Sequence, residues 1–189
     1  MRGVFIAMEY ERKSLYWIFA LLLLIIAPIV ILITPMIVSL TIGDSRDKIV
    51  FIPLSTSMVL YALAFLVVIV LLCVMYFSRS VLFNSITGII VLIGFILIFS
   101  QGVQNYVYLH QDYIEYNPVL GSNALYNWEE LASVSHEMYD EELDRDEKYI
   151  FEFNDGYTFE FLVSGIVNAE AQSKIYQKLL QLDVPYKEY

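Results

Sequence analysis

Three long stretches of apolar sequence carry no side chain that is charged at neutral pH, and they constrain the fold more than any other feature. Leu15 to Ile42, Leu54 to Phe77 and Val81 to Val103 contain no Asp, Glu, Lys, Arg or His. Each is at least as long as the roughly 20 residues that a helix needs to cross a bilayer. Only Ser78-Arg79-Ser80 separates the last two, which are therefore expected to form an antiparallel helical hairpin. We predict a membrane region over residues 1–104 with three spans, at about 15–42, 54–77 and 81–103.

Two prolines lie within the first apolar run. Pro28 and Pro35 each lack a backbone N–H and crowd the preceding helical turn, so a kink or an early helix end is expected.

The run exceeds the roughly 7–15 residues of a signal-peptide core, which indicates a retained span. Met8 is an alternative start to Met1. The segment 43–53 holds several charged residues and is predicted to be a hydrophilic loop.

The balance of basic and acidic residues changes at the end of the third apolar run. The formal net charge is −10, and 58% of the residues are hydrophobic. Before residue 104 six Lys or Arg stand against four Asp or Glu, whereas after it five stand against seventeen. The absence of Asp, Glu, Lys, Arg and His from the spans disfavours an ion-coupled pump. The acidic C-terminal part excludes nucleic acid as a partner, and no recognition of anionic lipid headgroups is expected, because both ligands are negatively charged.

The basic residues around the spans predict an orientation in the bilayer. The N-terminal segment holds three Lys or Arg and the second loop one, against two in the first loop and none over residues 104–123. Basic residues are enriched in cytoplasmic loops. The chain is therefore expected in the cell membrane as a multi-pass protein, with its N-terminus inside and its C-terminal domain outside.

The clearest feature after residue 104 is an aromatic hairpin over Lys148 to Val163. Apolar and polar residues alternate on both sides of a turn, which is typical of two half-buried strands. A three-residue loop that ends in Asp155 and Gly156, with Gly156 in the left-handed conformation, pairs Phe151 with Phe159 and makes one face aromatic. A two-residue loop would mix aromatic and charged side chains on the same face. We therefore predict the three-residue loop.

Four further strands and one helix are predicted around this hairpin. The strands cover residues 106–110, 113–117, 124–128 and 132–139, and the first two are joined by a two-residue turn. Asn168 is the expected N-cap of a helix that stops before Pro185. The helix carries one apolar stripe, made of Ala171, Ile175, Leu179 and Leu182.

This order of elements, the Trp-Glu-Glu-Leu segment at Trp128 and the Phe-rich hairpin resemble the bacterial PH-like domains that are attached to small membrane proteins. The resemblance covers residues 106–186. It implies a bent antiparallel sheet, partly closed as a barrel, with the C-terminal helix plugging one open end. It also implies that Trp128 is a core or rim anchor. Residues 105–189 are thus expected to form a small, acidic α+β domain.

The candidate chemistry of the domain is sparse. Residues 140–147 offer carboxylates at alternate positions, but Arg145 and Phe151 stand where a calcium-binding EF-hand loop needs Gly and Glu. We interpret the segment as a solvated loop and a candidate surface for a protein partner. Its acidic residues are Asp140, Glu141, Glu142, Asp144, Asp146 and Glu147.

The two histidines and the nearby serines indicate no active site. His110 and His136 have no Cys or second His at ligand spacing, so no zinc site is expected, and both are interpreted as polar, pH-sensitive strand positions. Ser133 and Ser135 lack a nucleophile elbow and are interpreted as incidental. No metal and no cofactor is predicted.

The preferred interpretation is a non-enzymatic integral membrane protein that presents a PH-like protein-interaction domain at the membrane surface. Its partners are the lipid bilayer and another protein. Two alternatives stay open at this point. One is a transport accessory subunit or small channel, with Pro28 and Pro35 as bends, and the other is an immunity or envelope-stress protein.

Overall fold

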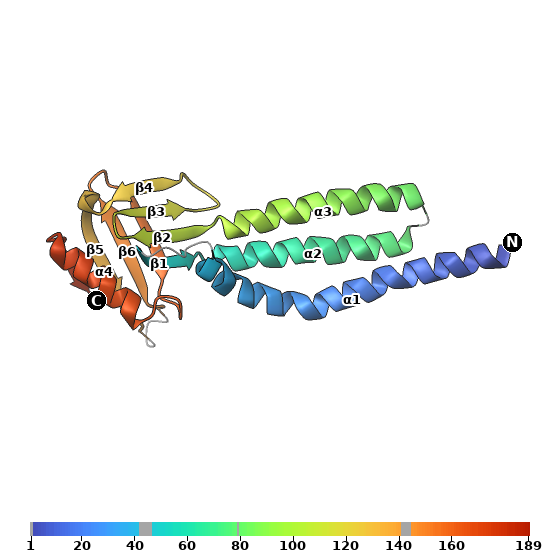
Figure 1. Cartoon of the computed structure of the whole chain (residues 1–189), viewed down its shortest axis with the longest axis horizontal. Helices are drawn as coiled ribbons and strands as arrows, with labels where there is room; N and C mark the ends of the chain where they lie inside the picture. Colours follow the sequence, from blue (N-terminus) through green and yellow to red (C-terminus); the bar gives the residue numbers. More distant parts are fainter. Residues whose placement is uncertain (1, 42–46, 79, 141–144) are drawn as a thin grey trace. The chain divides into compact units, whose positions relative to one another are not determined.

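The computed structural model of the chain describes residues 2–41, 47–78, 80–140 and 145–189, with side chains from residue 14 onward. The residues fall into two compact units. The helical unit holds residues 1–34 and 57–102, and the sheet unit holds residues 35–56 and 103–189. In chain order the elements are α1 (Arg2–Thr41), β1 (Lys48–Pro53), α2 (Thr56–Phe77), α3 (Val81–Val103), β2 (Tyr106–His110), β3 (Tyr113–Asn117), β4 (Ala124–Asn127), the short 3-10 helix η1 (Trp128–Glu130), β5 (Leu131–Glu137), β6 (Lys148–Phe153), β7 (Thr158–Leu162), α4 (Ala169–Gln181) and β8 (Tyr186–Glu188) (Figure 1).

The three predicted spans are confirmed. Ser14–Thr41, Thr56–Phe77 and Val81–Val103 are helices long and apolar enough to cross a membrane. Helix α1 continues through both Pro28 and Pro35, so of the two predicted outcomes, a kink or an early helix end, the early end does not occur. A helix keeps its remaining backbone hydrogen bonds satisfied in an apolar environment, which a helix end would not.

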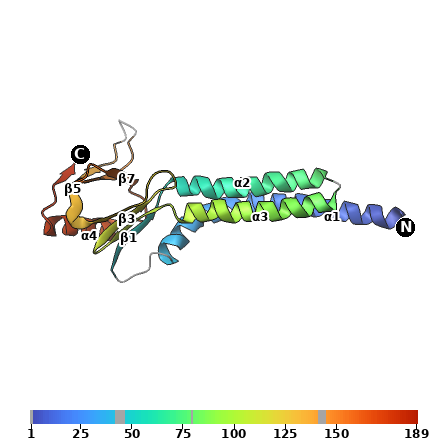
Figure 2. The same cartoon turned by 90° about the horizontal axis from the view of Figure 1, so that it is seen from above.

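Helices α2 and α3 run alongside each other in both views (Figure 1, Figure 2). Aromatic rings join them: Tyr61 lies 4.7 Å from Phe99, and Phe65 lies 5.4 Å from Phe95. Gly102 lets the backbone of α3 approach Tyr61, because a Cβ at this position would lie 2.5 Å from the Tyr61 ring. These contacts account for the predicted helical hairpin.

The sheet unit contains two four-stranded sheets, with strand orders β1-β2-β3-β4 and β7-β6-β5-β8. Strand β1 corrects the prediction of a loop over residues 43–53, which is wrong for Lys48–Pro53. Val50, Phe51 and Ile52 are buried there, and β1 pairs antiparallel with β2, so that Ile52 lies opposite Val107. Burial of these apolar side chains favours a strand over a solvated loop. Residues 42–46 lie outside the described part of the chain.

Asn105 makes hydrogen bonds to the segment that leads from β1 into α2, and it lies in the segment that leads from α3 into β2. It is buried, and its side-chain amide donates to the Thr56 hydroxyl at 2.6 Å. Its carbonyl accepts from Leu54 N–H at 3.0 Å, and its side-chain oxygen accepts from Val119 N–H at 3.1 Å. Thr56 begins α2, and Asn105 follows the end of α3 closely.

The predicted strand registers are confirmed. Ile114 pairs with Leu109 across β2 and β3, and Phe151 pairs with Phe159 across β6 and β7. The hairpin loop has the three predicted residues, because Phe153 N–H donates to Tyr157 C=O at 2.9 Å. Gly156 has φ of +83°, the left-handed conformation that glycine adopts without steric cost.

The core of the sheet unit lies on the aromatic face of the hairpin. Helix α4 is capped at Asn168 as predicted, since the Asn168 side chain accepts from Ala171 N–H at 2.9 Å. Ile175 and Leu179 are buried in the same apolar cluster as Trp128. Trp128 is fully buried and donates its indole N–H to the His110 carbonyl at 2.8 Å. It begins η1 rather than ending the preceding strand.

Candidate functional site: a buried histidine beside the C-terminal strand

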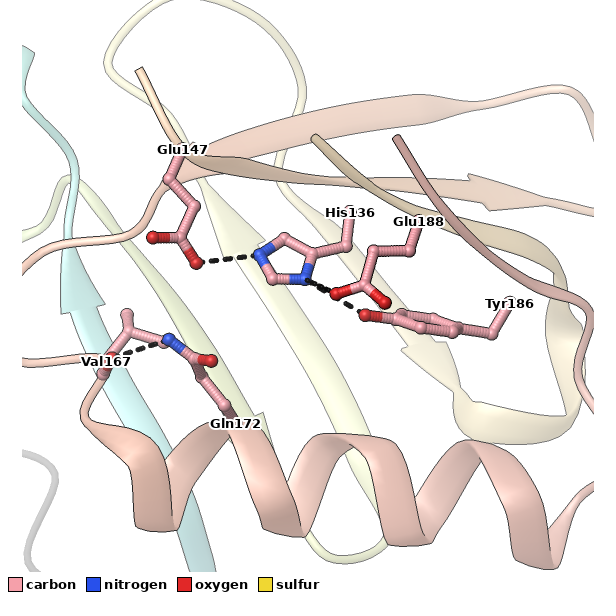
Figure 3. Close-up of polar contacts among 6 residues, drawn as sticks. All are labelled: His136, Glu147, Val167, Gln172, Tyr186 and Glu188. Carbon is pink, nitrogen blue, oxygen red and sulfur yellow. Dashed lines mark hydrogen bonds and ion pairs between the residues drawn. The ribbon is translucent and has the colours of Figure 1, made fainter. Parts of the chain in front are cut away.

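His136 is a buried titratable residue on the inner side of β5. Only 3% of it is exposed. Its Nε2 lies 2.8 Å from Glu147 Oε1, and its Nδ1 lies 2.9 Å from the Tyr186 hydroxyl (Figure 3). Glu188 approaches the same Nδ1 at 3.8 Å. A histidine with partners at both nitrogens and two carboxylates nearby forms the most polar buried group that we find in the described sheet unit.

The strand registers bring this group together. His136 pairs with Tyr149 on β6 and with Glu188 on β8. The Tyr149 ring stacks on the imidazole at 4.1 Å with an interplanar angle of 6°. Strand β8 was not predicted, because three residues after Pro185 give no detectable alternation. It runs parallel to β5, and Tyr189 N–H donates to the His136 carbonyl at 3.0 Å.

The donor and acceptor roles of the two ring nitrogens depend on the tautomer of His136. In the tautomer with a proton on Nε2, the ring donates to the Glu147 carboxylate, because an ionised carboxylate only accepts hydrogen bonds. In this neutral tautomer, Nδ1 accepts from the Tyr186 hydroxyl. In the imidazolium, Nδ1 is a donor and has the Tyr186 oxygen and the Glu188 carboxylate within reach. The ring thus has partners at both nitrogens in either state.

The two tyrosines of this group stay protonated over a wide range of pH. Burial, followed by the charges of neighbouring groups, raises the pKa of Tyr149. Burial and Glu188 raise the pKa of Tyr186. The Tyr186 hydroxyl therefore remains available as a donor to the neutral imidazole. On the helix side of this region, Gln172 of α4 donates its amide to the Val167 carbonyl at 3.4 Å (Figure 3).

The acidic segment that was predicted as one surface is divided in the structure. Glu147 turns toward His136 and is not fully exposed. Asp140 and Arg145 form an antiparallel bridge, with backbone N···O distances of 3.1 and 3.0 Å. Asp146 is exposed. The three remaining predicted residues, Glu141, Glu142 and Asp144, lie outside the described residues.

The other predicted residues lie elsewhere. Asp155 organises the hairpin loop, because it accepts from Tyr157 N–H at 2.9 Å and from the Tyr126 hydroxyl at 2.7 Å. These two hydrogen bonds, the Tyr126 bond first, lower the pKa of Asp155. The Asp155 carboxylate in turn raises the pKa of Tyr126 to about 12. Ser133 donates to Glu152 at 2.9 Å rather than to His136.

His136 and Glu147 were predicted separately, as a strand position and as an acidic loop residue, and their contact was not predicted. The available signal was the alternation of β5, which places His136 on the same face as the buried Val134. The absence of a bound metal stays a prediction. Within residues 2–41, 47–78, 80–140 and 145–189, no group of three or more His, Cys, Asp or Glu is arranged to hold a metal ion.

The chain is therefore a multi-pass membrane protein that carries a small two-sheet domain with a C-terminal helix. No protein-family model matches it, and no curated protein matches it either.

Proposed function

We propose that the chain is a non-enzymatic membrane protein whose three helices anchor the sheet unit so that this unit can bind another protein. The observation that carries the proposal is a group of exposed apolar side chains beside β8. We call it the β8–α4 patch, and it comprises Met138, Tyr139, Tyr176, Leu180 and Tyr189.

The residues of the patch come from two places in the sheet unit, the segments that follow β5 and β8 and the helix α4. At the end of β5, Met138 N–H donates to the Tyr189 carbonyl at 2.9 Å, which fixes these two residues side by side. On α4, Tyr176 and Leu180 are one helical turn apart and share a face. The Tyr176 ring lies 5.4 Å from Tyr186 of β8.

The chemistry of this patch fits a protein partner. Tyr139, Leu180 and Tyr189 are 64%, 62% and 68% exposed, although burial of such side chains is favourable. Tyrosine and methionine are enriched in protein interfaces, where large contact area is gained at low cost in side-chain entropy. Strand β8 is also an edge strand of its sheet, so a partner at this edge can contact both parts of the patch.

We also propose that the sheet unit lies outside the cell membrane and the N-terminus inside. The distribution of Lys and Arg supports this orientation. The pairing of β1 with β2 is in accord with three spans, because these strands precede α2 and follow α3 and must lie on the same side of the bilayer. The resemblance to PH-like domains supports an interaction role without specifying a partner.

Site-specific photo-crosslinking in cells tests the patch. A photo-reactive amino acid at Leu180 or Tyr189 is expected to capture the same protein. Leu125 on β4 is the matched control, because it is 68% exposed but lies in the other sheet. In the chain labelled at Tyr189, Leu180→Asp is expected to reduce capture about tenfold by placing a charge in the interface. Equal capture from Leu125, or none from Leu180 and Tyr189, contradicts the proposal.

A further inference from the structure

A pocket of about 250 Å³ in the sheet unit is lined mainly by groups that can donate hydrogen bonds to an anion. It lies among the start of β1, the turn between β2 and β3, and one face of α4. We call it the lysine pocket. Its polar lining residues are Lys48, Gln111, Lys174, Gln177, Lys178 and Gln181.

The charge of this lining contrasts with the unit around it. The described residues of the sheet unit include six Lys or Arg, at 48, 145, 148, 174, 178 and 187, and three of them line this one pocket. No Asp or Glu is among the described lining residues. Three lysines thus line one pocket in a part of the chain where acidic residues predominate.

The helical repeat explains why the α4 residues share the pocket. Lys174, Lys178 and Gln181 follow one another at intervals of four and three residues, which places them on one face of α4. Tyr176 and Leu180 lie on another face, so the pocket and the β8–α4 patch are separate surfaces. The C-terminal end of a helix carries a partial negative charge, so the lysines, and not the helix dipole, must supply the attraction for an anion.

Within the described part of the chain, two of these lysines have partners that compete little for their charge. Lys48 Nζ donates to the Ser39 carbonyl at 3.2 Å, a neutral partner. Lys174 pairs with Glu170 at 2.7 Å, but Lys174 and Glu170 are 47% and 72% exposed. Exposed ion pairs one helical turn apart contribute little, so a more highly charged anion can displace Glu170.

We propose that the lysine pocket binds a phosphate group. A phosphate monoester presents several oxygens that accept from ammonium and amide donors together, and it carries enough charge to compete with one carboxylate. The acidic surroundings repel extended polyanions and broad anionic surfaces, which favours a single compact phosphate. The expectation of no headgroup recognition was based on net charge, whereas this pocket concentrates positive charge locally. The phosphate can belong to a free metabolite or to a lipid headgroup.

The test uses the full-length protein. In the first arm, the detergent-solubilised protein is titrated with inorganic phosphate and with glycerol 3-phosphate at constant ionic strength, and ³¹P NMR and the melting temperature are measured against chloride. In the second arm, the protein is placed in nanodiscs of phosphatidylcholine with or without phosphatidic acid. Saturable binding in the first arm identifies a free phosphate, and stabilisation only by phosphatidic acid identifies a lipid headgroup.

The lysines that carry the proposal are tested by matched variants. K174Q/K178Q is expected to weaken phosphate binding at least about tenfold, because two charge-assisted donors are lost. K187Q removes one positive charge from an exposed position on β8, outside the pocket. It is expected to change phosphate binding less than about twofold. If K174Q/K178Q fails to fold, Q177E supplies the same test by adding a carboxylate to the lining. Absence of phosphate-specific binding in both arms, or equal losses in the pocket variants and K187Q, overturns the proposal.

Discussion

At the scale of single residues, Gly156 shows how one backbone conformation determines the register of a hairpin. Its φ of +83° closes the three-residue loop, and a Cβ built on it meets no atom within 4 Å. The requirement for glycine is therefore conformational and not steric. A two-residue loop would instead place Phe151 and Phe153 opposite charged or polar residues.

Gly156→Val is expected to destabilise the sheet unit by about 1–2 kcal/mol, because an L-residue rarely adopts the left-handed conformation. Gly165→Val is the matched control, since a Cβ at Gly165 also meets nothing within 4 Å and its φ lies outside the left-handed region. Denaturant unfolding followed by tryptophan fluorescence reports the change, because Trp128 lies in the core of this unit. Equal stability of the two variants contradicts the assigned role of Gly156.

Features of the fold with a local determinant were predictable from the sequence. Alternation and one glycine were sufficient for the β6–β7 register, and Asn168 was sufficient for the start of α4. The His136 group was out of reach, because Glu147 and Glu188 approach it only after β6 and β8 have paired with β5.

At the scale of elements, the α2–α3 hairpin depends on close approach at one end. Gly102 lies against Tyr61, which is fully buried and contacts Phe99. The sequence alone gives no reason to single out Gly102. The importance of Gly102 depends on which residue of α2 faces it, and periodicity along a uniformly apolar helix does not specify that.

Gly102→Ala is expected to destabilise the α2–α3 pair by about 1–3 kcal/mol, the usual cost of overpacking. The added Cβ would lie 2.5 Å from the Tyr61 ring and 3.3 Å from the Ser57 carbonyl oxygen, so more than one side-chain rotation is needed. Gly94→Ala is the control, because no heavy atom lies within 4 Å of its Cβ position. Thermal unfolding in detergent should separate the two variants, and an equal effect of both contradicts this packing argument.

Strand β1 was missed for a related reason. Its buried residues Val50, Phe51 and Ile52 form a short apolar run between charged residues and the second span. Such a run is ambiguous by periodicity alone. It forms a strand because it pairs with β2, and α2 and α3 separate these two strands in the sequence.

At the scale of the whole molecule, the pairing of β1 with β2 links the topology of the membrane region to the fold of the sheet unit. Both strands must lie on the same side of the bilayer as the C-terminus. The test uses a reporter enzyme that is active outside the cell and inactive in the cytoplasm. Fused at Tyr189, this reporter is expected to be active, in accord with the basic residues of the N-terminal segment. A reporter fused after residue 13 should give the opposite result. Cytoplasmic activity at Tyr189 would reverse the proposed orientation while leaving the β1–β2 pairing intact.

The position of β1 also determines when, during synthesis, the sheet unit can form. Strand β1 leaves the ribosome before α2, whereas its partner β2 follows α3. The first strand must therefore wait unpaired until the helical hairpin has entered the bilayer and returned the chain to the same side. Formation of the first sheet thus reports that α2 and α3 have not crossed the bilayer singly. A chain in which only one of these two helices inserted would leave β1 and β2 on opposite sides of the bilayer, with β1 unpaired.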